Sequence, residues 1–192
     1  MRLFLGVALT GPVANTLEHV SGAIKETSPA WREEKWVPRE NLHITVRFLG
    51  DVPDDEAPAL RALMAEVTSQ HPTHDITLNS VIARPRTRSA RMLWAAFDGA
   101  IGTTAALADA LSKSLASAGY GRPEHPFAPH ATLVRARRPR EISADALDAA
   151  RAVLDASSLQ DRTMSVTGVT LFASTLTPHG PQYDSLGVAT LA

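Results

Sequence analysis

Residues 41–50 read Asn-Leu-His-Ile-Thr-Val-Arg-Phe-Leu-Gly. Apolar and polar residues alternate along this stretch, which is typical of a β-strand with one buried face. The apolar positions are expected to face a core: Leu42, Ile44, Val46 and Phe48. The polar positions are expected to share the other face: His43, Thr45 and Arg47. The stretch therefore predicts a strand that presents a His-x-Thr motif on the side away from the core.

A second His-x-Thr motif lies in residues 126–135, which read Pro-Phe-Ala-Pro-His-Ala-Thr-Leu-Val-Arg. Alternation again places His130 and Thr132 on one face of a strand. A third match begins at His71, but it falls in a polar stretch whose proline disfavours a strand, so it is predicted to be a surface loop. Two motifs therefore remain as candidates for a functional site.

The two motifs occupy equivalent places in an internal repeat. Each half of the chain reads strand, helix, strand with His-x-Thr, helix, strand, and the motif histidines follow the start of each half, near residues 2 and 91, by 41 and 39 residues. The repeat predicts an α+β fold with two lobes related by a pseudo-two-fold axis. Two antiparallel sheets are expected to line a central cleft with helices outside, in one domain over 1–192. The sequence halves are about 1–88 and 89–192, and the scheme allows strands to exchange between lobes.

The individual elements follow from hydrophobic periodicity and from glycine and proline boundaries. Strands are predicted over residues 2–9, 42–49, 75–83, 91–97, 129–135, 163–173 and 183–190. Helices are predicted over residues 12–28, 55–69, 103–117 and 143–154.

Composition narrows the class of protein. The chain has 192 residues, of which 44% are hydrophobic and 20% charged, as in an ordinary folded domain. The absence of cysteine excludes disulfides, thiolate catalysis and cysteine metal sites, and it fits a cytoplasmic location. The apolar N-terminal stretch is interpreted as a strand rather than a signal peptide. No apolar run approaches the roughly 18 residues that span a bilayer, so no membrane partner is expected.

The formal net charge of −1 argues against a protein that wraps long nucleic acid, so an RNA substrate would be gripped at an end or over a short stretch. One cationic cluster stands out: Arg135, Arg137, Arg138 and Arg140. A solvated loop and a functional surface both explain this cluster, and the sequence does not separate them.

Two histidines on two symmetric lobes suit the hydrolysis of a cyclic phosphate. Opening the ring needs a base to take a proton from water and an acid to protonate the departing ribose oxygen, and histidine titrates near neutral pH. Because attack on phosphorus is in line, acid and base should stand on opposite sides of it. The threonine hydroxyls can donate hydrogen bonds to the non-bridging oxygens. No carboxylate stands beside the motifs, so no metal and no cofactor are expected.

These two extended motifs resemble those of the two-histidine phosphoesterase superfamily, and within it the RNA 2′,3′-cyclic phosphodiesterases, also called 2′-5′ RNA ligases. The resemblance spans nearly the whole chain. It implies a bilobal fold, hydrolysis of 2′,3′-cyclic phosphate ends to 2′-phosphomonoesters, and a weak, reversible 2′-5′ ligation of RNA ends. It implies His43 as proton donor, His130 as proton acceptor, and Thr45 and Thr132 as phosphate ligands.

Two arginines compete for the role of a further phosphate ligand. The resemblance implies an arginine five residues after the second histidine, which is Arg135. Strict alternation places Arg135 on the face opposite His130, unless the strand ends, twists or bulges there, whereas it places Arg47 on the His43 face. Both therefore stay candidates for substrate binding.

Aromatic residues near the motifs are less decisive. Phe127 either stacks on a nucleobase or packs in the core. The late segment that contains His179 and Tyr183 is expected to rim the cleft, with no role assigned to His179.

The expected partners are RNA ends or short oligonucleotides that carry a 2′,3′-cyclic phosphate, and no obligate protein partner is expected. One alternative is a phosphodiesterase for a small cyclic nucleotide or a sugar cyclic phosphate, which would use the same chemistry. Another is a non-catalytic nucleotide- or RNA-binding module, which would have lost a motif residue, although all four are present.

Overall fold

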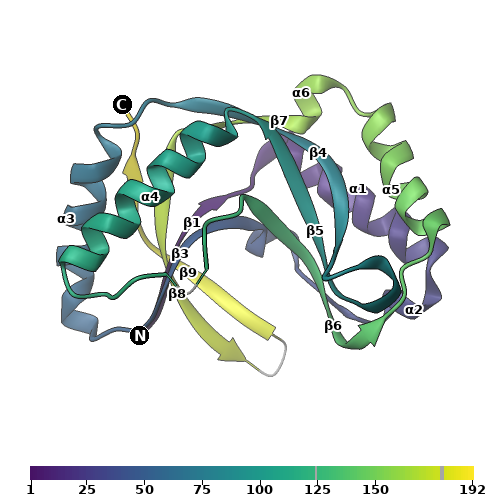
Figure 1. Ribbon diagram of the computed structural model, residues 1–192, viewed down its shortest axis with the longest axis horizontal. Coiled ribbons are helices and arrows are strands. Elements are labelled where there is room, and N and C mark those ends of the chain that lie inside the picture. The colour runs from purple at the N-terminus through teal and green to yellow at the C-terminus, as the bar shows by residue number, and fades with distance from the viewer. Residues whose placement is uncertain (124, 178–179) are drawn as a thin grey trace.

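The computed structural model describes residues 1–123, 125–177 and 180–192 (Figure 1). The strands are β1 (Arg2–Ala8), β2 (Lys35–Trp36), β3 (His43–Asp51), β4 (His74–Arg84), β5 (Ala90–Gly99), β6 (His130–Arg140), β7 (Thr163–Val166), β8 (Gly168–Thr177) and β9 (Gly180–Thr190). The α-helices are α1 (Gly11–Thr27), α2 (Pro29–Arg32), α3 (Ala57–Thr68), α4 (Ile101–Ser117), α5 (Ala144–Ala156) and α6 (Leu159–Arg162). The predicted elements are present, except that the segment 163–173 is divided between β7 and β8.

The strands form one curved, antiparallel sheet in the order β7-β4-β5-β6-β3-β1-β8-β9, with the short β2 paired to β6. The two halves of this order are joined between β3 and β6 by a single residue pair, Ile44 with Ala131. The mixed helix-and-strand fold predicted from the sequence is confirmed. The two expected sheets are the two arms of one continuous sheet, because β3 and β6 pair at this one point.

Helices cover the outer face of each arm (Figure 1). Helices α3 and α4 pack against one another, α3 against β8 and β9, and α4 against β3. Helices α1, α5 and α6 pack together over the other arm, against β4 and β7. Helix α1 and strand β4 precede residue 88, yet they lie in the lobe built around β5 and β6. The sequence halves therefore exchange elements between the lobes.

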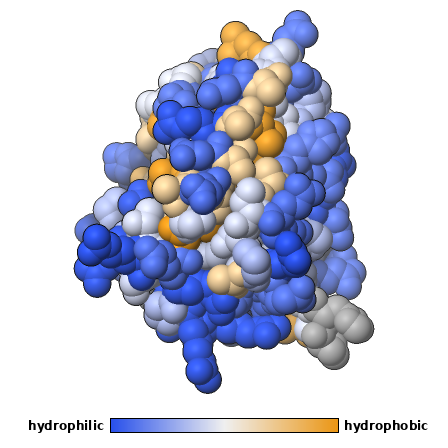
Figure 2. All heavy atoms as spheres, turned by 90° about the vertical axis from the view of Figure 1, so that its right-hand side faces the viewer, coloured by the Kyte–Doolittle hydropathy of each residue, from blue (hydrophilic) through white to orange (hydrophobic). Residues whose placement is uncertain are grey.

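The helices form because their apolar residues recur at helical spacing. In α1 the proline lies in the first turn, where it is tolerated, and the side chains that face the sheet are fully buried: Val13, Leu17, Val20 and Ile24. In α5 the Ser143 hydroxyl caps the helix by accepting a hydrogen bond from the Ala146 amide. Figure 2 shows the outer face of this lobe as mostly hydrophilic, with a narrow band of hydrophobic side chains. Among the described residues, none of the helices has the length and hydrophobicity to cross a membrane.

Strands β3 and β6 each contain a bulge at the third residue after their histidine. Across from β3, Gly6 pairs with Thr45 and Leu5 with Arg47, so Val46 is the extra residue. Across from β6, Trp94 pairs with Thr132 and Leu93 with Val134, so Leu133 is the extra residue. A bulge reverses the alternation of the residues that follow it. In both strands the side chain five residues after the histidine therefore returns to the histidine's face.

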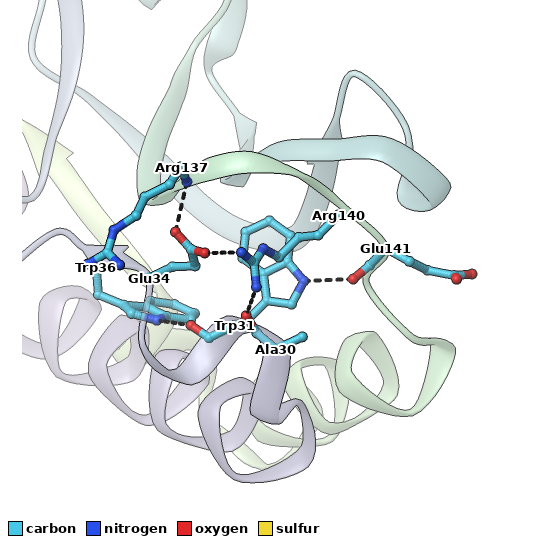
Figure 3. Close-up of polar contacts among 7 residues, drawn as sticks. All are labelled: Ala30, Trp31, Glu34, Trp36, Arg137, Arg140 and Glu141. Carbon is cyan, nitrogen blue, oxygen red and sulfur yellow. Dashed lines mark hydrogen bonds and ion pairs between the residues drawn. The ribbon is translucent and has the colours of Figure 1, made fainter.

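The far end of β6 is held to α2 by one buried carboxylate (Figure 3). The Glu34 side chain, only 5% exposed, forms an ion pair with Arg140 and accepts a hydrogen bond of 2.8 Å from the Arg137 amide. The Arg140 guanidinium also donates to the Ala30 carbonyl. The fully buried Trp31 indole also donates to the Glu141 carbonyl over 2.9 Å. We call these contacts of Glu34 and Trp31 the anchor of β6.

We expect Glu34→Ala to lower the free energy of unfolding by about 2 kcal/mol, because it leaves the Arg140 guanidinium without its carboxylate. Urea denaturation measures this change. The neighbouring Glu33 is exposed and forms no ion pair with any described residue, so Glu33→Ala is the matched control and should stay within about 0.5 kcal/mol of the parent. Equal effects of the two substitutions would contradict the assignment of the anchor to Glu34.

Candidate active site

The joint between the two arms brings the motif residues together. Ile44 and Ala131 pair directly, and both are fully buried on one face of the sheet. The residues on either side of this pair project from the opposite face: His43, Thr45, His130 and Thr132. All four are partly exposed. The structure thus places the two histidines, 87 positions apart in the chain, beside one another on a common surface.

His43 lies in an aromatic enclosure. Its Nδ1 donates a hydrogen bond to the Asn41 carbonyl over 2.7 Å, and its Nε2 lies 3.0 Å from the Thr45 hydroxyl. The ring centroid of Phe4 is 4.8 Å from that of His43, and Tyr183 meets His43 edge-on at 5.3 Å. The Asn41 side chain is itself held, because it donates to the Pro181 carbonyl over 2.8 Å. The imidazole is therefore fixed at its backbone side and along its faces.

His130 is held in the same way at Nδ1 but has different ring neighbours. Its Nδ1 donates to the Ala128 carbonyl over 2.7 Å. The ring lies flat on the indole of Trp94, with centroids 3.6 Å apart and planes inclined by 19°. The Arg84 guanidinium lies 5.0 Å from the centroid of the same indole. Within the described residues, the His130 Nε2 has no hydrogen-bond partner and is available to a bound molecule.

The backbone carbonyls determine the tautomer of both rings. A carbonyl oxygen can only accept a hydrogen bond, so the Nδ1 of each histidine must carry a proton. The Nε2 of each ring is then the atom that gains or loses a proton. This is the arrangement that a pair of proton-transfer groups requires, since both reactive nitrogens project away from their own backbone.

Burial lowers the pKa of both histidines below the ordinary value of 6.5. The hydrogen bonds from each Nδ1 to a backbone carbonyl oppose this effect, whereas the positive charge of Arg135 lowers both pKa values and the proximity of His130 also lowers that of His43. Because both pKa values lie below 6.5, the unliganded pair is mostly neutral at pH 7. A bound phosphate diester would oppose these effects, because its negative charge favours a protonated imidazole nearby.

Arg135 lies on the histidine face, and the bulge is the reason. Arg135 pairs with Met92 and Thr132 pairs with Trp94, and Met92 and Trp94 share a face because they are two residues apart on β5. One Arg135 nitrogen contacts the Met92 sulfur at 2.9 Å. Strict alternation therefore does not apply to Arg135, since the strand bulges at Leu133, which is one of the conditions under which Arg135 was expected to reach the histidine face.

The equivalent bulge in β3, where Val46 is the extra residue, makes the predicted position of Arg47 wrong. Arg47 is 7% exposed, and its guanidinium donates to the Tyr120 and Gly121 carbonyls over 3.3 and 3.1 Å. It therefore tethers the loop that follows α4 and does not face the substrate side. Phe48, expected in the core, is instead 64% exposed and lies on the His43 face, 5.9 Å from the Phe4 ring.

The remaining candidates are distributed around this centre. Phe127 is half-buried and packs at the edge of the core, so its contact with a nucleobase stays a prediction. Tyr183 adjoins His43, and it also lines a surface groove of about 470 Å³ together with Asn41, Pro181 and Gln182. His179 lies outside the described residues.

Sequence reasoning missed Trp94 as the platform for His130 and Phe4 as a wall for His43. Both lie on predicted strands, but only the strand register reveals that they face the motifs. In the part of the chain that the structure describes, no three His, Asp or Glu residues gather as a metal site would require.

The whole chain is similar to known phosphoesterases. The family model described as LigT like Phosphoesterase matches residues 10–94 and 100–183. A protein of Archaeoglobus fulgidus named RNA 2′,3′-cyclic phosphodiesterase is 32% identical over 188 residues, which cover 98% of this chain and 99% of that protein. One of the same name from Methanothermobacter thermautotrophicus is 27% identical over 188 residues, covering 98% and 97%.

A solved structure has the same fold. A crystal structure of a Thermus thermophilus protein superposes with a TM-score of 0.78 at 25% identity, covering 100% of this chain and 98% of that one. Because the family model spans both lobes and both His-x-Thr strands, the chain belongs to the LigT-like phosphoesterase family.

Proposed function

We propose that this protein hydrolyses the 2′,3′-cyclic phosphate at the end of an RNA to a 2′-phosphomonoester, with His43 as the proton donor and His130 as the proton acceptor. The observation that carries the proposal is the placement of two imidazoles on one face of the sheet, each with Nδ1 held by a backbone carbonyl. The relatives named RNA 2′,3′-cyclic phosphodiesterase, which match nearly end to end, support the reaction class.

The reaction needs one proton to be taken and one to be given. His130 Nε2 accepts a proton from water as the water oxygen bonds to phosphorus. The bond from phosphorus to the ribose O3′ breaks, and His43 Nε2 protonates that oxygen. Water is consumed, and the product keeps its phosphate on O2′. Each proton transfer is worth about 10²–10⁴ in rate.

The other motif residues stabilise the charge that develops on the phosphate. The Thr45 and Thr132 hydroxyls lie beside the two histidines and can donate to the non-bridging oxygens. The Arg135 guanidinium lies on the same face and supplies a positive charge. On the His43 side, the exposed Phe48 ring offers an apolar surface to the terminal nucleoside.

The same site would join RNA ends if a 5′-hydroxyl replaced water as the nucleophile. That reaction forms a 2′-5′ phosphodiester and is readily reversed, because the cyclic phosphate and the new diester have the same number of phosphate ester bonds. The absence of cysteine is compatible with action in the cytoplasm, which stays a prediction.

We expect His43→Ala and His130→Ala each to lower kcat/KM on a cyclic-phosphate-ended oligonucleotide by at least about 100-fold, because each removes one proton transfer. His19 lies exposed on α1, so His19→Ala is the matched control and should change kcat/KM less than twofold. Chromatographic identification of the 2′-phosphate product follows the reaction. Near-parental rates in either motif variant with normal circular dichroism would refute the acid–base assignment.

The pH dependence of kcat/KM should be bell-shaped, with its maximum on the acid side of 6.5, because both histidine pKa values are lowered in the free enzyme. Arg135→Gln removes a positive charge that lowers both values, so it should move both limbs to higher pH and raise KM about tenfold. Imidazole NMR titration measures the shift directly. Arg151→Gln, on the outer face of α5, is the control, and an unmoved profile in Arg135→Gln would place that arginine outside the site.

Activity should survive exhaustive treatment with EDTA, because the two imidazoles supply both proton transfers. The measurement is turnover of the same oligonucleotide before and after dialysis against the chelator, with metal analysis of the protein. A loss of activity that zinc or magnesium restores would contradict the two-histidine mechanism.

A further inference from the structure

The positive charge of this protein is concentrated in two short segments. Residues 84–91 and 135–140 together hold eight arginines and no aspartate or glutamate. The whole chain has 19 Lys and Arg against 20 Asp and Glu, so the rest of the protein has 11 cationic and 20 acidic residues. The net charge of −1 is therefore the sum of a charge of +8 on these two segments and a net charge of −9 on the rest of the chain. The electric field near these segments is that of a basic protein.

The fold brings the two segments side by side at one end of the lobe. The turn between β4 and β5 lies against the far end of β6, at the lower right of Figure 1. Ala90 pairs with Arg140 and Met92 with Arg135, and the Ile142 amide donates to the Thr87 carbonyl over 2.9 Å. The arginine-rich turn between β4 and β5 and the arginine-rich end of β6 are therefore neighbours in the fold.

Seven of these eight arginines are exposed, and none of the seven forms an ion pair with a described carboxylate. We call them the arginine surface: Arg84, Arg86, Arg88, Arg91, Arg135, Arg137 and Arg138. The eighth, Arg140, is the one held by Glu34 (Figure 3). Because like charges repel, such a group is unfavourable unless an anion binds it.

The arginine surface begins at the candidate active site. Arg135 lies on the face of the catalytic pair, and Arg84 lies over the Trp94 ring on which His130 stacks. Arg86 and Arg88 follow Arg84 along the turn. On the other side of the site the wall is aromatic, with Tyr183 beside His43 and the exposed Phe48 next to Phe4. On that side Arg2 is the cation whose charge reaches Tyr183, so a polyanion that enters the site is attracted mainly along the lobe of β5 and β6.

We propose that the arginine surface binds the phosphodiester backbone of single-stranded RNA upstream of the cyclic end, so that the enzyme prefers oligonucleotide ends to mononucleotides. This inference rests on the proposed function, because the strand must leave the site through the 5′-oxygen of the terminal nucleoside. Guanidinium groups bind phosphate without reading bases, so the surface supplies affinity and direction rather than sequence preference. It also explains how a protein of near-zero net charge can hold RNA.

The test compares two substrates in one double variant. Arg86→Gln/Arg88→Gln removes two charges that lie outside the catalytic machinery. We expect kcat/KM for a nucleoside 2′,3′-cyclic phosphate to change less than twofold. For a ten-nucleotide RNA with the same end, we expect about a tenfold loss at low salt. For this RNA, the negative slope of log kcat/KM against log salt concentration should become shallower by about 1.4. Each phosphate contact of a single strand contributes about 0.7 to its steepness, and two contacts are removed.

Lys113→Gln/Arg151→Gln is the matched control, because it removes two charges from the outer helices α4 and α5. It should leave both substrates and the salt slope unchanged. Equal losses on the mononucleotide and the oligonucleotide in the arginine double variant, or no loss on either, would overturn the inference.

Binding separates this inference from the proposed function. Fluorescence anisotropy with a labelled ten-nucleotide RNA that ends in a 2′-phosphate needs no turnover. Salt-dependent binding that weakens about tenfold in Arg86→Gln/Arg88→Gln supports the arginine surface even if the parent protein hydrolyses neither substrate, an outcome that would refute only the proposed function. Hydrolysis of both substrates without salt-dependent RNA binding would refute only the arginine surface.

Discussion

The site depends on one contact in the backbone, the pairing of Ile44 with Ala131 between β3 and β6. It is the point at which the two arms, β7-β4-β5-β6 with β2 and β3-β1-β8-β9, become one sheet. The paired residues occupy equivalent positions in the two motifs, so the pseudo-two-fold axis passes between them. Each backbone position near the axis then has an equivalent position in the other lobe. The two histidines meet because each is one residue from the axis, and the fold needs no long loop to bring them together.

The bulges in β3 and β6 determine which further side chains lie on the same face as the histidines. Without them, alternation along each strand would direct the fifth residue after the histidine into the helices. With them, that residue joins the histidine's face in both lobes, as Phe48 in one and Arg135 in the other. The position between, which carries Arg47 in one lobe and Val134 in the other, is buried in both. One irregularity of the backbone, repeated by symmetry, therefore decides which side chains the substrate meets.

The sequence predicts the elements, the repeat and the two motif pairs well, because these depend on side-chain periodicity. It fails for Arg47 and Phe48, because a bulge is a property of backbone hydrogen bonding that periodicity does not contain. The second motif does indicate its bulge, since the adjacent residues Leu133 and Val134 are both apolar and so interrupt the alternation. The first motif does not show this pattern, because the equivalent of Val134 is Arg47, a polar residue whose guanidinium donates to two loop carbonyls. Superposing the motifs on their histidines would have matched Phe48 with Arg135.

Symmetry alone would make a poor acid–base pair, because two identical environments give two histidines with interchangeable roles. The side chains around the axis remove that equivalence. Gly6 and Trp94 occupy equivalent places opposite Thr45 and Thr132, so only His130 has an indole beneath it. His43 instead has Phe4 and Tyr183 around it and a hydroxyl at Nε2, while the His130 Nε2 meets no described side chain and can meet water. The charges differ as well, because Arg84 and Arg135 lie on the His130 side. A duplicated backbone thus aligns the two proton-transfer groups, and the differences between the copies allow one to give a proton while the other takes one.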